Sequence, residues 1–545
     1  MCVLSVSITM KLERLWLPLT AAVLALTTAL LRFKTRFSGD ALFMERLATD
    51  LFADGGRWVD WKFTAAPSFL PDMPLYFLAY FALPDAASRI FAVSVAQAFL
   101  IAGVAVWFAR QLSPQLSRRA MAVIVLAVAL VTLASARSGM WLYFYSTNNH
   151  LAALFGGLLA FVAALRYYER GSTRAAVALP IVLGLATVST GLTTLSVTVP
   201  ALLLLALTWT VQRRSPAVAT ARRRTGILFG LVVTGAVLAQ LLARVLIHHA
   251  ALEGKIHARP DTAGRALVLF MEATAAAFDP ANRATLVVSV LLVGALLFLG
   301  WRLLRRFVPD NGGLRLTPGD LRIDAAGALL ACVVPVVLLG AILSGRFGDQ
   351  YAHRYFVFPL ALAALLAIVL LDRRGHVHLW DAVLLCGGVA VTTGAVVTLR
   401  TVHPEENPNE IAACMTALER QGEHLRAGIS DFWLGPTVRE HMIPKPPMIN
   451  TLNDLSPNFW VSTIGPLLRP ERYPQYRFNF VLMRAPAGDA GNSGYLPETI
   501  GRILPPPTRK HACPGTHVWV YDGPELDVAV RHSAAQYLRA KNIRP

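Results

Sequence analysis

The sequence predicts an all-α polytopic membrane protein with a small α+β domain at its carboxyl end. Of its 545 residues, 55% are hydrophobic and only 15% are charged, whereas a soluble domain is about 25% charged. The apolar residues gather in long runs within residues 1–400, while residues 401–545 are polar and rich in proline. This composition excludes a disordered chain, a fibrous rod and a disulfide-dense secreted module.

About eleven runs are long and apolar enough to cross a bilayer as helices, which takes about 20 residues. They lie at 15–32, 89–109, 120–137, 148–166, 175–189, 192–211, 226–247, 284–304, 324–345, 355–372 and 380–400. The fifth and sixth runs are joined by Ser189-Thr190-Gly191, which we interpret as a tight hairpin. No small-residue cleavage site follows the first run, so we expect a retained helix. Met10-Lys11-Leu12 resembles a second translation start.

Arginine-rich loops alternate with loops that are long or poor in charge. The arginine-rich loops carry Arg110/Arg118/Arg119, Arg166/Arg170/Arg174, Arg213/Arg214/Arg222/Arg223/Arg224, Arg302/Arg305/Arg306/Arg315/Arg322 and Arg373/Arg374. Positive charge in short loops marks the cytoplasmic side, so we expect a cytoplasmic N-terminus and an external C-terminus. Most of the net charge of +18 is then a topology signal, and nucleic acid is not an expected partner.

Two segments are predicted to lie outside the membrane. The first loop, residues 33–88, is rich in aromatic and acidic residues. Residues 401–545 are numerous enough for a small domain, with a helix expected around 411–426 and strands at 478–483 and 517–521. We therefore divide the chain into a membrane domain, 1–400, and a C-terminal domain, 401–545.

The cysteines fit this division. Cys414 and Cys513 are the only two in the C-terminal domain, and an external compartment is oxidising, so we expect a disulfide between them. Cys332 and Cys386 lie within apolar runs and are expected to be inert. Neither external cysteine belongs to a CxxC motif, so the sequence assigns no metal site; a divalent metal remains possible as a cofactor.

Polar residues that could take part in a reaction gather on the external side of the spans, not within them. They are Asp40, Glu45, Asp60, Lys62, Asp72, Arg89, Asn148, Asn149, His150, Arg346, Asp349, His353 and Arg354. Ionisable residues inside spans mark ion and proton paths, and here they are nearly absent, with Arg244 as the main exception. The distribution favours a reaction at the external face over transport.

Several short motifs together resemble one family. Gly39-Asp40-Ala41-Leu42 follows the first span, Pro67-Ser68-Phe69-Leu70-Pro71-Asp72-Met73-Pro74-Leu75-Tyr76 comes thirty residues later, and Ser88-Arg89-Ile90 opens the second span. Later stretches agree, among them Gly184-Leu185-Ala186, Arg354-Tyr355, Phe358-Pro359-Leu360 and Gly428-Ile429-Ser430-Asp431-Phe432-Trp433. These motifs resemble the GT-C fold of polyprenyl-phosphate-dependent glycosyltransferases, particularly bacterial protein O-mannosyltransferases, aminoarabinose transferases and rhizobial lipopolysaccharide-core transferases.

The resemblance implies an acidic residue at Asp40, a Pro-Pro-Leu-Tyr-like turn ending at Tyr76, and a basic residue at Arg89. It implies a bacterial inner-membrane location with a periplasmic C-terminal domain. Two positions depart from the family pattern. Ala41 stands where many members have a second acid, and Ser189-Thr190 stands where many have a basic residue.

Inverting transfer of a sugar from a lipid phosphate to a hydroxyl needs a base for the hydroxyl proton and cations for the leaving phosphate. Asp40, at the membrane boundary, is the candidate base; the alternative is a helix cap. Asp72 is a second candidate for catalysis or acceptor contact, with capping of the next helix as its alternative. Glu45 lies about one helical turn beyond Asp40 and either shares its face or is solvated.

The candidates for substrate binding lie on the same external side: Glu45, Tyr76, Arg89, His150, Arg346 and Arg354. Arg354 and Arg346 could hold the phosphate, because guanidinium groups bind phosphate with paired hydrogen bonds; the alternative is charge at a helix end. His150 could donate to substrate or form part of a cap.

Asp60 and Lys62, flanked by Trp58 and Trp61, could contact a sugar by stacking and hydrogen bonds, and Asp431 and Trp433 could contact the acceptor. For the tryptophans we favour ordinary roles. Trp58 and Trp61 are expected to anchor the first loop at the membrane surface. Trp433 is expected in the core of the C-terminal domain.

The sequence therefore predicts a membrane glycosyltransferase. Its expected partners are a polyprenyl-phosphate-linked sugar, a lipid, glycan or protein acceptor, and membrane lipids. The alternatives are a transporter or flippase of lipid-linked glycans, and a non-catalytic scaffold of envelope assembly with the same fold.

Overall fold

A computed structural model describes residues 2–34, 39–63, 66–137, 151–212, 219–247, 260–304, 307–310, 313–316, 320–343, 355–375, 377–401, 408–458, 462–485 and 495–540. Within these residues, nine helices are long and apolar enough to cross a membrane. They are α1 (Cys2–Lys34), α4 (Ala86–Leu112), α5 (Arg118–Arg137), α6 (Leu151–Arg170), α8 (Val199–Gln212) with its preceding π-helical turn η3 (Thr194–Thr198), α9 (Ala219–Leu246), α11 (Arg283–Leu304), α12 (Leu321–Leu343) and α14 (Val377–Thr401).

Two shorter apolar helices, α7 (Thr173–Ser189) and α13 (Val357–Asp372), complete the set. Together the eleven coincide with the predicted runs, so the all-α polytopic class is confirmed. The predicted hairpin after α7 is also present, since the Thr193 amide donates to the Thr190 carbonyl (3.0 Å). A further helix, α10 (Pro260–Ala277), lies between α9 and α11 and was not predicted.

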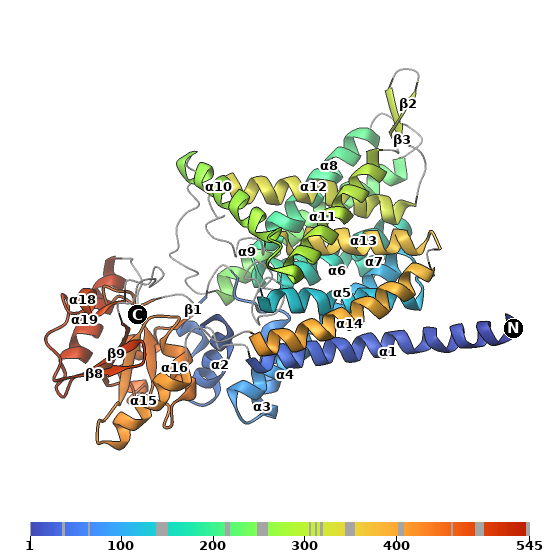
Figure 1. Ribbon diagram of the computed structural model, residues 1–545. Helices are drawn as coiled ribbons and strands as arrows, with labels where there is room; N and C mark the ends of the chain where they lie inside the picture. The colour runs from blue at the N-terminus through green and yellow to red at the C-terminus, as the bar shows by residue number, and fades with distance from the viewer. Residues whose placement is uncertain are drawn as a thin grey trace.

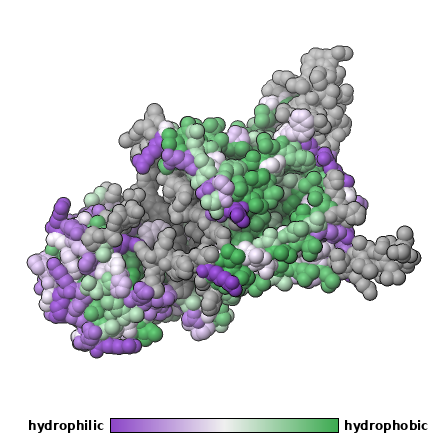
Figure 2. Space-filling model, viewed as in Figure 1, coloured by the Kyte–Doolittle hydropathy of each residue, from purple (hydrophilic) through white to green (hydrophobic). Residues whose placement is uncertain are grey.

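The helices pack closely where small residues face a neighbour. A Cβ added to Gly235 of α9 would lie 2.8 Å from the Leu183 Cβ and 3.2 Å from the Pro180 carbonyl oxygen of α7. Small residues let helix backbones approach in this way. Outward-facing Leu207, Leu297 and Leu385 are 59%, 69% and 61% exposed, as suits contact with lipid tails. Figure 2 shows hydrophobic residues covering the helix bundle, whereas the C-terminal domain is largely hydrophilic.

The arginine-rich loops meet at one end of the bundle. Their salt bridges are Arg322–Glu169 (2.7 Å), Arg373–Asp320 (2.6 Å), Arg119–Asp381 (2.8 Å) and Arg119–Glu13 (3.7 Å). The loop before α12 also contains a short hairpin, β2 (Phe307–Asp310) with β3 (Gly313–Leu316). Figure 1 shows the N-terminus and the C-terminal domain at opposite ends of the helices. The grouping of these loops thus agrees with the predicted alternation of sides.

The C-terminal domain is built on a five-stranded mixed sheet with the order β5-β4-β7-β9-β8. Its strands are β4 (Ala427–Ser430), β5 (Met448–Asn450), β7 (Phe478–Arg484), β8 (Arg509–Cys513) and β9 (Thr516–Val520). Its helices are α15 (Pro408–Arg420), α16 (Gly435–His441), α17 (Gly465–Leu468), α18 (Pro497–Ile500) and α19 (Glu525–Ala540), with the 3-10 turn η6 (Pro470–Arg472). β7, β9 and the N-terminal part of the predicted first helix lie where the sequence indicated.

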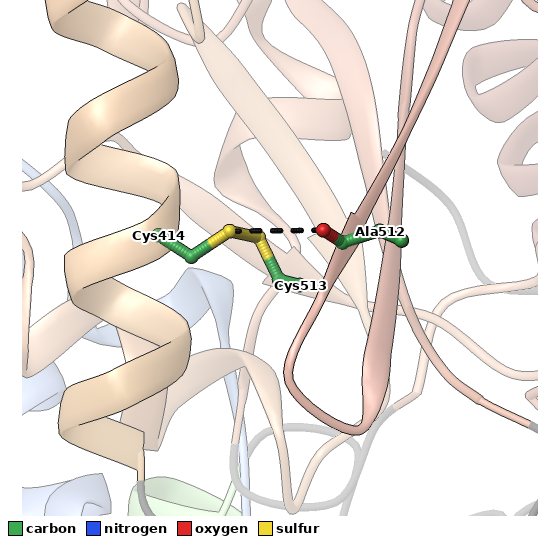
Figure 3. The surroundings of a disulfide bond; sticks show 3 residues. All are labelled: Cys414, Ala512 and Cys513. Carbon is green, nitrogen blue, oxygen red and sulfur yellow. Dashed lines mark hydrogen bonds between the residues drawn. A yellow bond between two sulfur atoms is a disulfide. The ribbon is translucent and has the colours of Figure 1, made fainter.

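Both faces of the sheet are covered. Phe480 and Leu482 of β7 belong to the hydrophobic core formed with α15 and α16, while Val481 and Met483 belong to the core formed with α19. A strand buried on both faces reads as a continuous apolar run, which explains the sequence Phe480–Met483. A disulfide joins Cys414 of α15 to Cys513 at the end of β8, with the Cα atoms 5.8 Å apart (Figure 3). This is the pairing expected from the sequence.

The first loop contains α2 (Gly39–Phe52), the 3-10 turn η1 (Trp58–Asp60), β1 (Trp61–Lys62) and α3 (Asp72–Ala82). β1 pairs with β6 (Ser462–Thr463) of the C-terminal domain, so that Trp61 faces Thr463 and Lys62 faces Ser462. Two segments about 400 residues apart in sequence thus form one sheet. This pairing places the C-terminal domain against the first loop.

Candidate active site

Asp72 lies at the base of the first loop, where the loop meets the membrane helices. The segment before it is fixed to the end of α7, because the Ser68 amide donates to the Ser189 carbonyl (2.9 Å) and the Leu70 amide donates to the Ser189 Oγ (3.1 Å). Asp72 is the first residue of α3 and only 1% exposed. The loop therefore holds a carboxyl group against the α7–α8 hairpin.

The Asp72 carboxyl group is only partly satisfied. Its Oδ1 accepts a short hydrogen bond from the Gln97 side chain of α4, while its Oδ2 is buried and has no hydrogen-bond partner in the described part of the chain. Burial raises the pKa of Asp72 to about 7, and the hydrogen bond from Gln97 lowers it in part. No side-chain hydrogen bond caps α3. Side-chain capping of α3 is thus not observed, and the chemical role of Asp72 stays a prediction.

Glu45, Tyr76 and Arg89 form one buried network, although the sequence suggested them as separate substrate contacts. Glu45 accepts from the Tyr76 hydroxyl (2.7 Å), the Arg89 guanidinium (2.6 Å) and, more weakly, the Thr49 hydroxyl (3.3 Å). The Glu45 and Arg89 side chains are 7% and 12% exposed, so the solvated alternative for Glu45 is wrong.

Arg89 is held on its remaining sides as well. Its Nε and Nη2 donate to the carbonyls of Leu83 (2.9 Å) and Pro84 (3.0 Å), and the guanidinium lies 4.2 Å from the Tyr80 ring centroid. Every side of the ion pair is thus engaged within the protein. The network joins α2, α3 and α4, and its geometry is that of a clamp on the first loop.

Four candidate residues receive no structural test. The backbone of Asp40 is in the first turn of α2, but its side chain lies outside the described part of the structure. His150, Arg346 and Arg354 also lie outside the described residues. Their assigned roles stay predictions.

The aromatic residues of the first loop differ from expectation. Trp61 is 1% exposed and donates from Nε1 to Asp50 Oδ2 (2.6 Å), and Trp58 donates to the Leu246 carbonyl (2.9 Å). The membrane-anchor interpretation is therefore wrong for Trp61, which is enclosed by protein. Lys62 is 2% exposed, and burial lowers its pKa to about 8.

The loop after β4 also differs from expectation. Asp431 accepts from the amides of Trp433 (2.7 Å) and Leu434 (2.8 Å) and so orders the start of α16. Phe432 is 3% exposed and packs among first-loop residues, while Trp433 is 50% exposed and is not the core residue that the sequence suggested. The buried aromatic residue of this loop is Phe432, the neighbour of Trp433.

The junction of the first loop and the C-terminal domain contains polar residues that sequence reasoning missed. A small cavity of about 20 Å³, room for roughly one water molecule, is lined by Arg46, Thr49, Asp50, Asp54 and Trp61 of the first loop and by Arg439, Met448, Ile449, Asn450, Ser462, Thr463 and Tyr476 of the C-terminal domain. Arg46 and Asp50 stand four residues apart on α2, a spacing that places both on one helix face. Only the folded contact shows that this face is covered.

No group of three or more His, Cys, Asp or Glu side chains converges as a metal site among the residues that the structure describes. Four described carboxylates of the first loop, Glu45, Asp50, Asp60 and Asp72, are engaged by Arg89, Trp61, Arg469 and Gln97 respectively. They suit proton transfer and ion pairing.

Comparisons with known proteins add a likeness of architecture. No protein-family model matches the sequence, and no curated protein has a matching sequence. Among solved structures, the chain is similar to an oligosaccharyltransferase from Archaeoglobus fulgidus in complex with Zn and sulfate, with 13% identity and a TM-score of 0.43 over 85% of this chain and 68% of that one. It is also similar to ArnT from Cupriavidus metallidurans, both bound to undecaprenyl phosphate (12% identity, TM-score 0.37, 93% of this chain and 97% of that one) and in the apo state (13%, 0.38, 95% and 98%).

All three TM-scores are below 0.5, so the likeness is partial. It does not by itself assign a reaction to this chain.

Proposed function

We propose that the protein is a membrane glycosyltransferase that moves a sugar from a polyprenyl-phosphate carrier to a hydroxyl acceptor at the periplasmic face of the bacterial inner membrane. The acceptor classes are a lipid, a glycan or a protein. The donor class and the location come from the sequence resemblance. The side chains of the first loop support the chemistry.

The observation that carries the proposal is the Asp72 carboxyl group. It is buried, it keeps one oxygen without a hydrogen-bond partner among the described residues, and burial raises its pKa to about 7. A carboxyl group in this state takes a proton readily at neutral pH. An unsatisfied buried carboxyl oxygen costs stability, and such a cost is typical of functional sites.

In the proposed reaction, a carboxylate accepts the acceptor hydroxyl proton as that oxygen attacks the sugar anomeric carbon. The bond from the anomeric carbon to the carrier phosphate breaks, and the phosphate leaves as an anion that needs no acid. Asp40 and Asp72 are the two carboxylates proposed for the site. Arg354 and Arg346 are proposed to stabilise the phosphate charge.

The experiment compares envelope glycans and glycoproteins by mass spectrometry in cells that lack the gene and carry a plasmid copy of it. We expect the wild-type copy to restore a hexose- or pentose-sized increment that the Asp72→Asn and Asp40→Asn copies do not restore. Asp85→Asn is the matched control, because Asp85 is an exposed N-cap of α4 in the same loop and asparagine caps equally well.

Equal membrane levels of all four proteins make the comparison valid. Identical glycans with and without the gene would contradict glycosyl transfer. Full restoration by both Asp72→Asn and Asp40→Asn would contradict the assigned base.

A further inference from the structure

One face of α7 is turned away from the helices around it. Its other sides pack on α6 at Gly156 and on α9 at Gly235, where an added Cβ would lie 2.2 Å and 2.8 Å from side-chain atoms of α7. On the outward face, Val177 and Ile181 are 57% and 45% exposed. Because α7 is one of the apolar runs predicted to cross the bilayer, we expect this face to lie against lipid.

The outward face of α7 contains a hollow of about 520 Å³, within the range of ligand-binding sites. It lies along α7 alone, and its lining residues are Thr173, Arg174, Val177, Ala178, Ile181 and Val182. These residues form two neighbouring rows with a spacing of four, one starting at Thr173 and the other at Arg174. Ala178 has the smallest side chain of the set, which leaves space between the rows.

The hollow is polar at one end and apolar along the rest. Thr173 and Arg174 lie at the arginine-rich end of the bundle, and the other lining residues are apolar. From Thr173 to Val182 the helix rises about 14 Å, close to the hydrocarbon depth of one leaflet, which is half of about 30 Å. The dimensions therefore match one acyl chain beneath a headgroup.

α7 is also short for a helix that spans a membrane. Its 17 residues extend about 26 Å, less than the hydrocarbon thickness of about 30 Å. Its outer end is fixed to the first loop through Ser189, so Arg174 at its inner end cannot lie far beyond the hydrocarbon. We therefore expect the Arg174 guanidinium at the level of the lipid phosphates.

The polar end of the hollow lies in basic surroundings. Arg224 of α9 donates to the carbonyls of Tyr168 (2.6 Å) and Glu169 (3.0 Å), so it lies beside the turn that leads into α7. Arg170 and Arg174, on either side of this turn, are exposed. Basic pockets at one side of a membrane bundle are typical sites for anionic lipid headgroups.

The protein itself offers little negative charge to this end. Glu169 is the only acidic residue between Asp85 and Glu253. Its two carboxylate oxygens accept from the Arg322 guanidinium (2.7 and 2.9 Å). The charge of the arginines around the hollow is therefore complementary to an anion from outside the protein.

We propose that this hollow binds one phospholipid with an anionic headgroup, in the leaflet at the arginine-rich end of the bundle. The lipid phosphate accepts hydrogen bonds from the Arg174 guanidinium and the Thr173 hydroxyl, and one acyl chain lies over Ala178. A zwitterionic headgroup also offers a phosphate, but its ammonium group is repelled by the arginines around the hollow. This inference is independent of the proposed transfer reaction.

The test is native mass spectrometry of the full-length protein in detergent, titrated with phosphatidylglycerol or with phosphatidylethanolamine of the same acyl chains. We expect the first phosphatidylglycerol to bind at least about fivefold more tightly, the effect of about one basic side chain near an anionic headgroup. Arg174→Gln should weaken its binding about tenfold, as expected for the loss of a hydrogen bond between charged groups. Arg118→Gln is the matched control, because Arg118 is exposed at the same end but outside the hollow, and it should leave binding unchanged.

A second variant tests the apolar part of the hollow. Ala178→Phe fills it and should weaken the binding of both lipids, whereas Val237→Phe, at an outward position of α9 that is 53% exposed, should not. Arg174 is exposed, so Arg174→Gln keeps the test valid if Ala178→Phe does not fold.

Three results would overturn the proposal. They are equal binding of the two lipids by the wild type, phosphatidylglycerol binding that Arg174→Gln does not weaken, and a dimer without bound lipid that Ala178→Phe disrupts. The last result would assign the hollow to a second copy of the chain. No sugar donor or acceptor is needed, so failure here and failure of the proposed function are distinguishable.

Discussion

Replacement of Glu45 by leucine tests the clamp on the first loop. Glu45→Leu leaves the Arg89 guanidinium, 12% exposed, with carbonyl acceptors only, and it removes the acceptor of the buried Tyr76 hydroxyl. Loss of one partner of a buried ion pair costs about 3–5 kcal/mol. Local opening of α2 and α3 should therefore increase by about 150- to 5,000-fold, since about 1.4 kcal/mol corresponds to a factor of ten.

Hydrogen exchange of α2 and α3 peptides measures this opening directly. The decisive comparison is the pair of single variants with the double variant Glu45→Leu/Arg89→Leu. The double variant leaves no unpaired buried charge, so its cost should be well below the sum of the two single costs. Asp522→Asn, which breaks the exposed Arg509–Asp522 pair (side chains 40% and 57% exposed), is the control and should leave the exchange of α2 and α3 unchanged. Unchanged exchange in Glu45→Leu, or strictly additive costs, would refute the clamp.

Three further predictions concern other parts of the chain. If ionised Asp72 is the base, turnover should rise about tenfold per pH unit well below its pKa of about 7 and level off above about pH 8; a flat profile would speak against it. Cys414→Ser removes a disulfide that spans 99 residues and should destabilise the C-terminal domain by about 2–5 kcal/mol. The measurement is the midpoint of thermal unfolding of this domain, which should fall. Cys386 is a free cysteine in α14, so the control Cys386→Ser should leave the midpoint unchanged. Phe432→Ala should destabilise the junction with the first loop by about 3–5 kcal/mol, which should appear as faster hydrogen exchange of β1 and β6. Trp433 is exposed, so the stability of the junction in Trp433→Ala should stay within about 0.5 kcal/mol of wild type.

The membrane helices could be predicted from the sequence because their signal is local. A run of about 20 apolar residues is typical of a membrane-spanning helix and of little else, and all eleven runs became helices. The disulfide between Cys414 and Cys513 followed from compartment and count alone. The alternate arginine-rich loops likewise meet at one end of the bundle, as their spacing indicated.

The structure of the first loop was harder to predict, because the surroundings of its side chains are formed by residues far away in the sequence. Trp61 carries the same aromatic signal whether it lies at a lipid surface or against protein, and only the pairing of β1 with β6 decides between the two. Asp50 and Arg46 carry no sequence signal for the cover that the C-terminal domain provides. For Asp72, the unrecognised partner was Gln97, a polar residue within an otherwise apolar span, and that polarity is a signal the sequence does carry.

The most direct test of the central claim is the conversion of a lipid-linked sugar to free polyprenyl phosphate by the purified protein. The protein is placed in liposomes of total envelope lipid from cells that lack the gene, where unused donor and acceptor accumulate. We predict that the wild type and Asp85→Asn release polyprenyl phosphate at similar rates, and that Asp72→Asn does so at least about a hundredfold more slowly. No release by the wild type, or equal release by Asp72→Asn, would contradict the account.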